Sequence, residues 1–200
     1  MYIGIDLGTS GIKVILLASN GAVVDSVSAE LSVRRPCPLW SEQEPAHWWQ
    51  ALQQCMQQLS NRQSLAGAKA IGLAGQMHGA TLLDSSNQII RPAILWNDGR
   101  AFAQCQQLEQ QVPQLQQLTG NLAMPGFTAP KLIWLREHEP DIFARVAMVL
   151  LPKDYLRFCL SGDFASDMSD SAGTLWLDMA ARDWSDELLC VCGLSRNQMP

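Results

Sequence analysis

Apolar and polar residues alternate along the first thirty positions in the pattern of half-buried β-strands. Three such runs cover residues 2–7, 12–18 and 22–31, and only GTSG and SNG separate them. Connections of this length join antiparallel neighbours. The sequence therefore predicts that the chain begins with a three-strand antiparallel meander.

The apolar spacing becomes helical after residue 44. Pro45 suits the first turn of a helix, and the apolar stripe that follows consists of Trp48, Leu52, Met56 and Leu59. A short apolar run then covers residues 68–76. Because a helical crossover leads into this run, we expect a buried strand that is parallel to its neighbour.

Short apolar runs and amphipathic segments alternate in the middle of the chain. Residues 80–96 are typical of a hairpin that turns at 85–87. A Gln-rich helix follows, and Pro113 is expected to end or kink it. Its inward-facing positions are predicted to be Phe102, Cys105, Leu108 and Val112.

The last third of the chain predicts further helices and one strand. The expected elements are helices at 129–138 and 140–146, a buried strand within 147–152, a helix at 153–162 that Gly162 closes, and a helix that begins in the tail after residue 183. This order predicts an α/β domain around a mixed sheet, because strands and helices alternate after the initial meander.

Composition narrows the possible partners. The net charge is −5 and no basic run is present, which argues against binding of nucleic acid. No apolar run approaches the roughly 18 residues that span a bilayer, so no membrane association is expected. The six cysteines lack metal-binding spacing and are interpreted as reduced, mostly buried thiols of a cytoplasmic protein.

The turn in DLGTSG is the first candidate site. A turn of small residues leaves backbone N–H groups free for a phosphate, and Thr9 and Ser10 beside Gly8 add hydroxyl groups. Asp6 would repel a phosphate unless a cation intervened, so we expect Asp6 to hold Mg²⁺ through water. A plain hairpin in which Asp6 caps its own turn is the alternative, and Lys13 either points to solvent or reaches a phosphate.

The segment GQMHG ends the apolar run at 68–76 and supplies Gln76, Met77 and His78. Ligands of α/β sheets collect at the carboxyl ends of strands, and a neutral imidazole offers one donor and one acceptor to a sugar hydroxyl. The segment therefore predicts a substrate site. A histidine that only satisfies a loop backbone is the alternative.

The segment WNDGR places an aromatic plate, an amide, a carboxylate and a guanidinium within five residues: Trp96, Asn97, Asp98 and Arg100 beside a glycine. A polyhydroxylated substrate requires an apolar platform together with fixed donors and acceptors. We therefore interpret these residues as substrate-binding. A helix cap with a surface ion pair is the alternative.

A polar loop near the C-terminus contains Asp163, Asp167 and Asp170. Its spacing does not match a calcium-binding loop, so we interpret it as a turn network. Asp170 and Ser171 are the positions expected to border a cleft.

At this point several segments together resemble the FGGY family of carbohydrate kinases, and within it the bacterial branch that acts on xylulose. The segments are YIGIDLGTSGIKVILL, LWSEQEPAHWWQA, GLAGQMHGATLLD, RPAILWNDGRA, TGNLAMPGFTAPKLIWL, LLPKDYLRFCLSGDFASDMSDSAGTLWLD and RDWSDELL. The resemblance implies a ribonuclease H-like lobe of the actin and hexokinase type, with a mixed five-stranded sheet and flanking helices. It covers essentially all 200 residues.

The resemblance also implies an activity, namely transfer of the γ-phosphoryl group of MgATP to D-xylulose, which gives D-xylulose 5-phosphate. Residues 1–200 would form the N-terminal, sugar-binding and phosphate-binding lobe of a two-lobe kinase. The catalytic base is expected after Pro200 in a C-terminal lobe, so this chain alone is expected to be inactive. The intact enzyme could form a homodimer.

Three alternatives stay open at this point. The chain could be a non-catalytic sugar-binding module, or part of a kinase for another ketose or polyol such as ribulose. An actin-like or chaperone-like ATPase is the third, because the opening motif is shared with those proteins.

Overall fold

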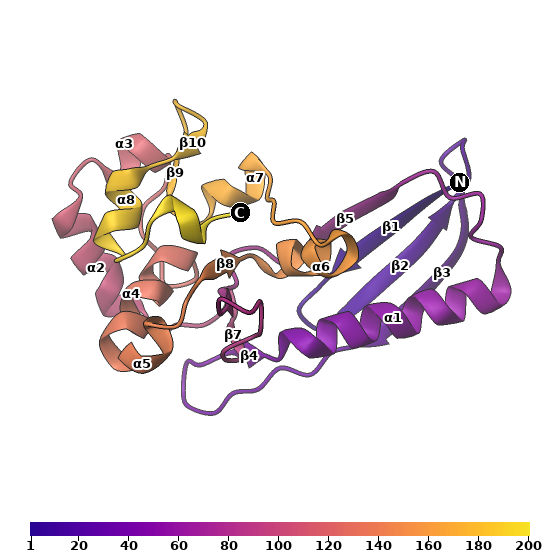
Figure 1. Cartoon of the computed structure of the whole chain (residues 1–200), viewed down its shortest axis with the longest axis horizontal. Helices are drawn as coiled ribbons and strands as arrows, with labels where there is room; N and C mark the ends of the chain where they lie inside the picture. Colours follow the sequence, from indigo (N-terminus) through magenta and orange to yellow (C-terminus); the bar gives the residue numbers. More distant parts are fainter.

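The computed structural model describes all 200 residues and contains one main sheet (Figure 1). Its strands are β1 (Tyr2–Leu7), β2 (Gly11–Leu17), β3 (Val23–Glu30) and β5 (Ile71–Gly75), in the order β3-β2-β1-β5. The first three strands are antiparallel, and β5 is parallel to β1. The predicted meander and the predicted parallel strand are both confirmed.

The prediction of five strands is wrong, because the main sheet has four. The remaining apolar segments pair elsewhere. Strand β6 (Thr81–Leu83) pairs with β8 (Met148–Leu150), and β7 (Ala93–Ile94) pairs with β4 (Glu42–Gln43). The predicted hairpin at 80–96 therefore keeps its local turn, but its two arms pair mainly with distant segments.

Two helices cover one face of the main sheet. Helix α1 (Pro45–Arg62) begins with its proline in the first turn, and α6 (Pro152–Ser161) ends at Gly162, whose φ of 78° suits glycine. The inward residues of the strands alternate with exposed ones, as the sequence pattern predicts. They form a core with the two helices that includes Ile5, Leu7, Trp48 and Leu156.

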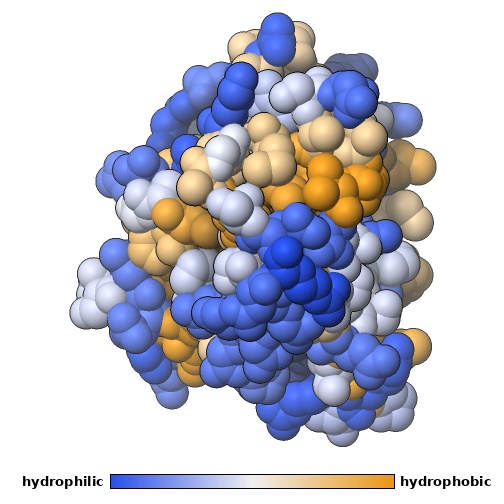
Figure 2. All heavy atoms as spheres, turned by 90° about the vertical axis from the view of Figure 1, so that its right-hand side faces the viewer, coloured by the Kyte–Doolittle hydropathy of each residue, from blue (hydrophilic) through white to orange (hydrophobic).

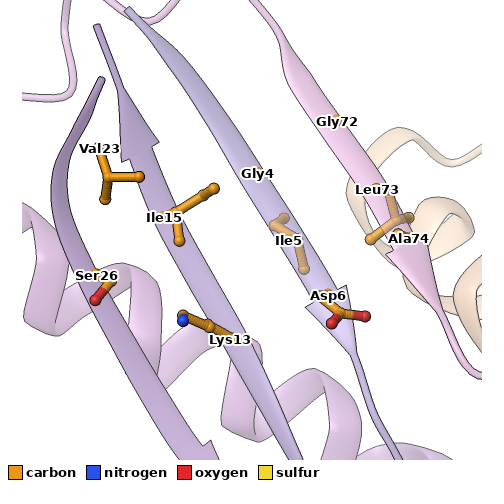
Figure 3. Close-up of a pocket in the computed structure, with 10 residues that line it drawn as sticks. All are labelled: Gly4, Ile5, Asp6, Lys13, Ile15, Val23, Ser26, Gly72, Leu73 and Ala74. Carbon is orange, nitrogen blue, oxygen red and sulfur yellow. The ribbon is translucent and has the colours of Figure 1, made fainter. Parts of the chain in front are cut away.

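The opposite face of the main sheet is open. A hollow of about 580 Å³ lies on this face, and Figure 3 shows Asp6, Lys13 and Ile15 among its lining residues. Strand β5 is largely exposed, so the expectation of a buried strand is wrong; as an edge strand it has a partner on one side only. Figure 2 views the molecule from the end of the sheet where β1 begins and β2 ends, and it shows apolar side chains beside a broad polar area.

A second, mostly helical half lies beside the sheet (Figure 1). Its elements are α2 (Phe102–Gln111), α3 (Leu115–Thr119), α4 (Thr128–His138), α5 (Pro140–Phe143), α7 (Met168–Ala172), β9 (Leu177–Asp178), β10 (Asp183–Trp184), α8 (Asp186–Val191) and the 3₁₀ helix η1 (Arg196–Gln198). A second apolar core of 21 buried residues centres on α4. No helix of the structure meets the length and hydropathy that a membrane span requires.

Several local predictions need correction. Phe102 is 64% exposed rather than inward-facing, because it occupies the first turn of α2, whereas Leu108 and Val112 are buried as expected. The helix expected at 140–146 ends at Phe143. All six cysteines are free, but only Cys55, Cys105 and Cys192 are buried.

Candidate functional site

The turn between β1 and β2 presents free backbone donors. Within it the Gly8 N–H donates to the Gly11 carbonyl over 2.9 Å, while the N–H groups of Thr9 and Ser10 have no partner in the chain. A Cβ atom at Gly11 would lie 2.8 Å from the Ala29 carbonyl oxygen, so this position requires glycine. The turn can therefore offer two N–H groups to an anion.

Two opposite charges lie exposed beside this turn. Asp6 lies one residue before the end of β1 and is directly opposite Lys13 in the register of the sheet, and both point to the open face (Figure 3). Neither makes an ion pair. Both also line a second hollow of about 720 Å³ that includes Gly8 and Ser10. A carboxylate in this setting fits Mg²⁺ held through water and ligand phosphates, and the chain contains no cluster of three metal-binding side chains.

The Thr9 hydroxyl was expected to donate to a phosphate, but its proton already forms a hydrogen bond inside the protein. It donates to Gln76 Oε1 over 3.1 Å and accepts from the Trp96 indole over 2.9 Å. A hydroxyl has only one proton to donate. The expectation that this hydroxyl donates to a phosphate is therefore not supported, and the backbone N–H of Thr9 is the available donor.

A third open hollow, of about 410 Å³, lies next to the turn and is called the His78 hollow below. Four predicted residues line it: His78, Trp96, Asn97 and Asp98. The other lining residues are Gly99 and the segment 124–127, which the sequence did not identify as a site. The proline-glycine pair ahead of a helix is the one signal for this segment, since it indicates a sharp loop.

The His78 side chain has a defined orientation. Its backbone φ of 62° is rare for a residue with a side chain, and its Nδ1 lies 2.9 Å from the Gly173 carbonyl oxygen. A carbonyl only accepts, so Nδ1 carries the proton and Nε2 of the neutral ring is an acceptor. Burial is the main cause that lowers the His78 pKa, and nearby Lys131 lowers it further. At neutral pH the ring is therefore uncharged.

Lys131 is fully buried and connects two walls of this hollow. Its Nζ donates to the His78 carbonyl over 2.7 Å and to the Gly126 carbonyl over 2.6 Å. Burial lowers the Lys131 pKa to about 7. The neutral amine still has two protons for the two carbonyls. This role could not be predicted from the sequence pattern, because Lys131 lies within an otherwise apolar helical segment.

The side chains of Asp98 and Arg100, which we expected to bind substrate, are buried in the protein. Both side chains are at most 1% exposed, and they pair with each other over 2.7 Å. Asp98 also accepts from the Ser41 N–H over 2.6 Å, while Arg100 stacks 3.6 Å above the Trp40 ring and pairs with Glu42. Their charged groups are therefore engaged by contacts inside the protein, where they support the wall of the hollow.

The last two predicted residues lie beside the hollow. Gln76 is part of the hydrogen-bond network at the turn, and Met77 is 37% exposed but does not line the hollow. Their proximity to His78 follows from sequence adjacency alone.

The acidic loop has the structural role that its sequence indicates. Lys153 pairs with Asp154, Asp167 and Asp170 over 2.6, 2.8 and 3.2 Å. These pairs hold the segment whose Gly173 carbonyl orients His78. Asp163 lies outside this network.

These features define an α/β lobe in which a phosphate-binding type of turn adjoins a small-molecule hollow. The pattern described as "FGGY family of carbohydrate kinases, N-terminal domain" matches residues 1–200, and the chain belongs to this family. The chain is also 62% identical over 200 residues to the xylulose kinase of Escherichia coli (strain K12). That alignment covers 100% of this chain and 41% of the relative, so the chain spans about two fifths of the relative's length.

Solved structures agree with this assignment. A "xyloylose kinase" from Brucella ovis matches with a TM-score of 0.97 at 51% identity, over 100% of this chain and 42% of that one. The xylulose kinase of Rhodospirillum rubrum matches with a TM-score of 0.96 at 27% identity, again over 100% and 42%. The predicted actin- and hexokinase-like lobe is thus confirmed, apart from the number of strands.

Proposed function

We propose that residues 1–200 form the N-terminal, sugar-binding and phosphate-binding lobe of a two-lobe kinase that converts D-xylulose to D-xylulose 5-phosphate with MgATP. The observation that carries this proposal is the contact between the two candidate sites. Trp96, which lines the His78 hollow, donates a hydrogen bond to Thr9 of the exposed turn. A sugar in the hollow and a phosphate at the turn would therefore be neighbours.

The phosphate side of the proposal rests on the exposed groups. The N–H groups of Thr9 and Ser10 would bind phosphate oxygens, with Gly8 and Gly11 allowing the close approach. Asp6 would hold Mg²⁺ through water, and that ion would supply neutralising charge on the transferred phosphoryl group. Lys13, opposite Asp6 in the sheet, is positioned to contribute a second positive charge.

The sugar side of the proposal rests on the residues that line the His78 hollow. Trp96 and Phe127 provide apolar surfaces for the C–H groups of an open-chain sugar, and the Nε2 atom of His78 would accept from one of its hydroxyls. Asn97 would supply both a donor and an acceptor. Met77 and Gln76 would border this site, while Asp98 and Arg100 would hold its wall in place.

The proposal places the catalytic base outside these residues. Phosphoryl transfer to a hydroxyl uses a base that accepts the hydroxyl proton. Among the titratable groups that line the hollow, the Asp98 carboxylate is paired with Arg100 and accepts a hydrogen bond from the Ser41 N–H. His78 would serve to position the sugar. We therefore propose that a C-terminal lobe supplies the base, that this chain alone is inactive, and that the intact enzyme works in the cytoplasm, where ATP is available.

Sugar-dependent release of ADP by the intact protein tests this function. We expect D-xylulose to stimulate ADP formation more than D-ribulose, xylitol or glycerol does, and Asp6→Asn to reduce the stimulated rate by about 10²–10³-fold. Equal rates with and without any of these sugars would favour an ATPase of the actin or chaperone type. Tight binding of D-xylulose without any ADP formation by the intact protein would favour a sugar-binding module.

A further inference from the structure

A closed ring of hydrogen bonds lies beneath the phosphate-binding turn. Thr9 Oγ1 donates to Gln76 Oε1, Gln76 Nε2 donates to Gln43 Oε1 over 3.0 Å, and Gln43 Nε2 donates to the Thr9 carbonyl over 2.7 Å. The three side chains come from the turn, from the end of β5 and from β4. The ring therefore ties the turn to two separate strands.

Two indole groups fix the direction of every bond in this ring. Trp48 is fully buried and its Nε1 donates to Gln43 Oε1 over 3.0 Å. An indole N–H can only donate, so Gln43 must present its oxygen to Trp48 and its NH₂ group to Thr9. Gln76 must then present its oxygen to the Thr9 hydroxyl. The remaining acceptor position of that hydroxyl is taken by the indole N–H of Trp96.

Trp96 is the member of this network that a ligand can reach. Its side chain is 48% exposed and lines the His78 hollow, whereas Gln43 and Trp48 are buried. A sugar packed against the ring of Trp96 would restrict its rotation and keep its N–H on Thr9. The phosphate-binding turn would then be ordered before a phosphate arrives, which lowers the entropic cost of the second binding event.

We infer that Trp96 couples the two sites, so that occupation of the hollow by a sugar tightens the binding of nucleotide phosphate at the turn through the hydrogen bond from Trp96 to Thr9. This inference rests on the proposed function, since it assigns the two ligands as proposed above. It makes Trp96, Gln76 and Gln43 positioning residues. Coupling between binding sites is reciprocal, so nucleotide must tighten sugar binding by the same factor.

The test measures the dissociation constant of a non-hydrolysable ATP analogue with Mg²⁺, with and without saturating D-xylulose, by calorimetry on the intact protein. We call the ratio of the dissociation constants without and with xylulose the coupling factor. For the wild-type protein we expect this factor to be at least about five. Trp96→Phe keeps an aromatic face but removes the N–H, and should reduce this coupling factor by about threefold or more. Trp184→Phe removes an indole N–H that bonds to Pro200 at the other end of the chain, and should keep the wild-type factor.

A double-mutant cycle with Thr9→Val separates coupling from general destabilisation. Thr9→Val removes the hydroxyl with little change of shape, and should reduce the coupling factor as much as Trp96→Phe does. The double variant should lose nothing further, because both changes remove the same hydrogen bond. Independent, additive losses would overturn the inference, as would a wild-type factor near one or an unchanged factor in Trp96→Phe. A wild-type protein that binds neither ligand would instead overturn the proposed function.

Discussion

The two halves of the candidate site use their charged residues in opposite ways. At the exposed turn, Asp6 and Lys13 face solvent and have no ion-pair partner. At the His78 hollow, Asp98 and Arg100 are buried and paired with each other. Both pairs look alike in the sequence, where each is a carboxylate and a cation near a glycine.

This difference indicates which charges are available to a ligand. A buried, paired charge has already exchanged its hydration for contacts inside the protein, and removing one partner leaves the other uncompensated. An exposed, unpaired charge can still bind a cation or a phosphate. We therefore expect changes at Arg100 to affect folding first, and changes at Asp6 to affect the reaction first.

The largest expected effect on stability comes from Arg100→Met. This change leaves the buried carboxylate of Asp98 without its cation and should lower the free energy of unfolding by about 3–5 kcal/mol. Chemical denaturation measures it. The matched control is Arg34→Met, because Arg34 pairs with Glu44 while 61% exposed, and its loss should cost less than about 1 kcal/mol. Equal effects for the two variants would contradict the distinction drawn above.

Lys131→Met should have the next largest effect. It leaves the Gly126 carbonyl without its lysine donor and the His78 carbonyl with only the Thr128 hydroxyl, which should cost about 1–3 kcal/mol. The pH dependence of the free energy of unfolding tests the role of Lys131 more specifically. The folded pKa is about 7 and the unfolded value is near the ordinary 10.5, so the unfolded chain binds more protons between these values. Wild-type stability should therefore rise as the pH rises from 7 to about 10.

Thermal unfolding of both proteins across this pH range checks the prediction. Lys131→Met has no amine to titrate, so its stability should show a smaller rise. The same slope in both proteins would show that Lys131 keeps an ordinary pKa in the folded state.

Gly173→Ala should have a smaller effect, and this effect should be confined to the affinity for the sugar. A Cβ atom at this position would lie 2.1 Å from His78 Cε1 and 2.3 Å from its Nδ1, so the imidazole must move. We expect D-xylulose to bind about tenfold more weakly, because His78 loses its orienting hydrogen bond. Gly67→Ala is the control, since its nearest neighbour would be 3.5 Å away. Unchanged binding in Gly173→Ala would remove His78 from the sugar site.

Local patterns predicted much of the fold. The meander, α1 and the parallel β5 follow from alternation, helical spacing and the length of connections, which depend on neighbouring residues only. The fifth strand was wrong because β6 and β8 are short apolar segments that pair with each other instead of joining the sheet. A sequence pattern identifies a strand but not its partner.

The candidate site was predictable to a similar extent. The motifs identified Asp6, His78 and Trp96, which the structure places beside the turn or in the hollow. They did not reveal that Asp98 is buried, that Lys131 joins two walls or that the Thr9 proton is already used. Each of these properties depends on contacts between residues far apart in the chain, such as the bond from Trp96 to Thr9.

The central claim is that Asp6 serves the phosphate side and His78 the sugar side of one site. Calorimetric titration of D-xylulose into the intact Asp6→Asn protein tests this division most directly. The account predicts a dissociation constant within about twofold of wild type, even though sugar-stimulated ADP formation falls by about 10²–10³-fold. Loss of xylulose binding in this variant would contradict the account, because it would place Asp6 in the sugar pocket.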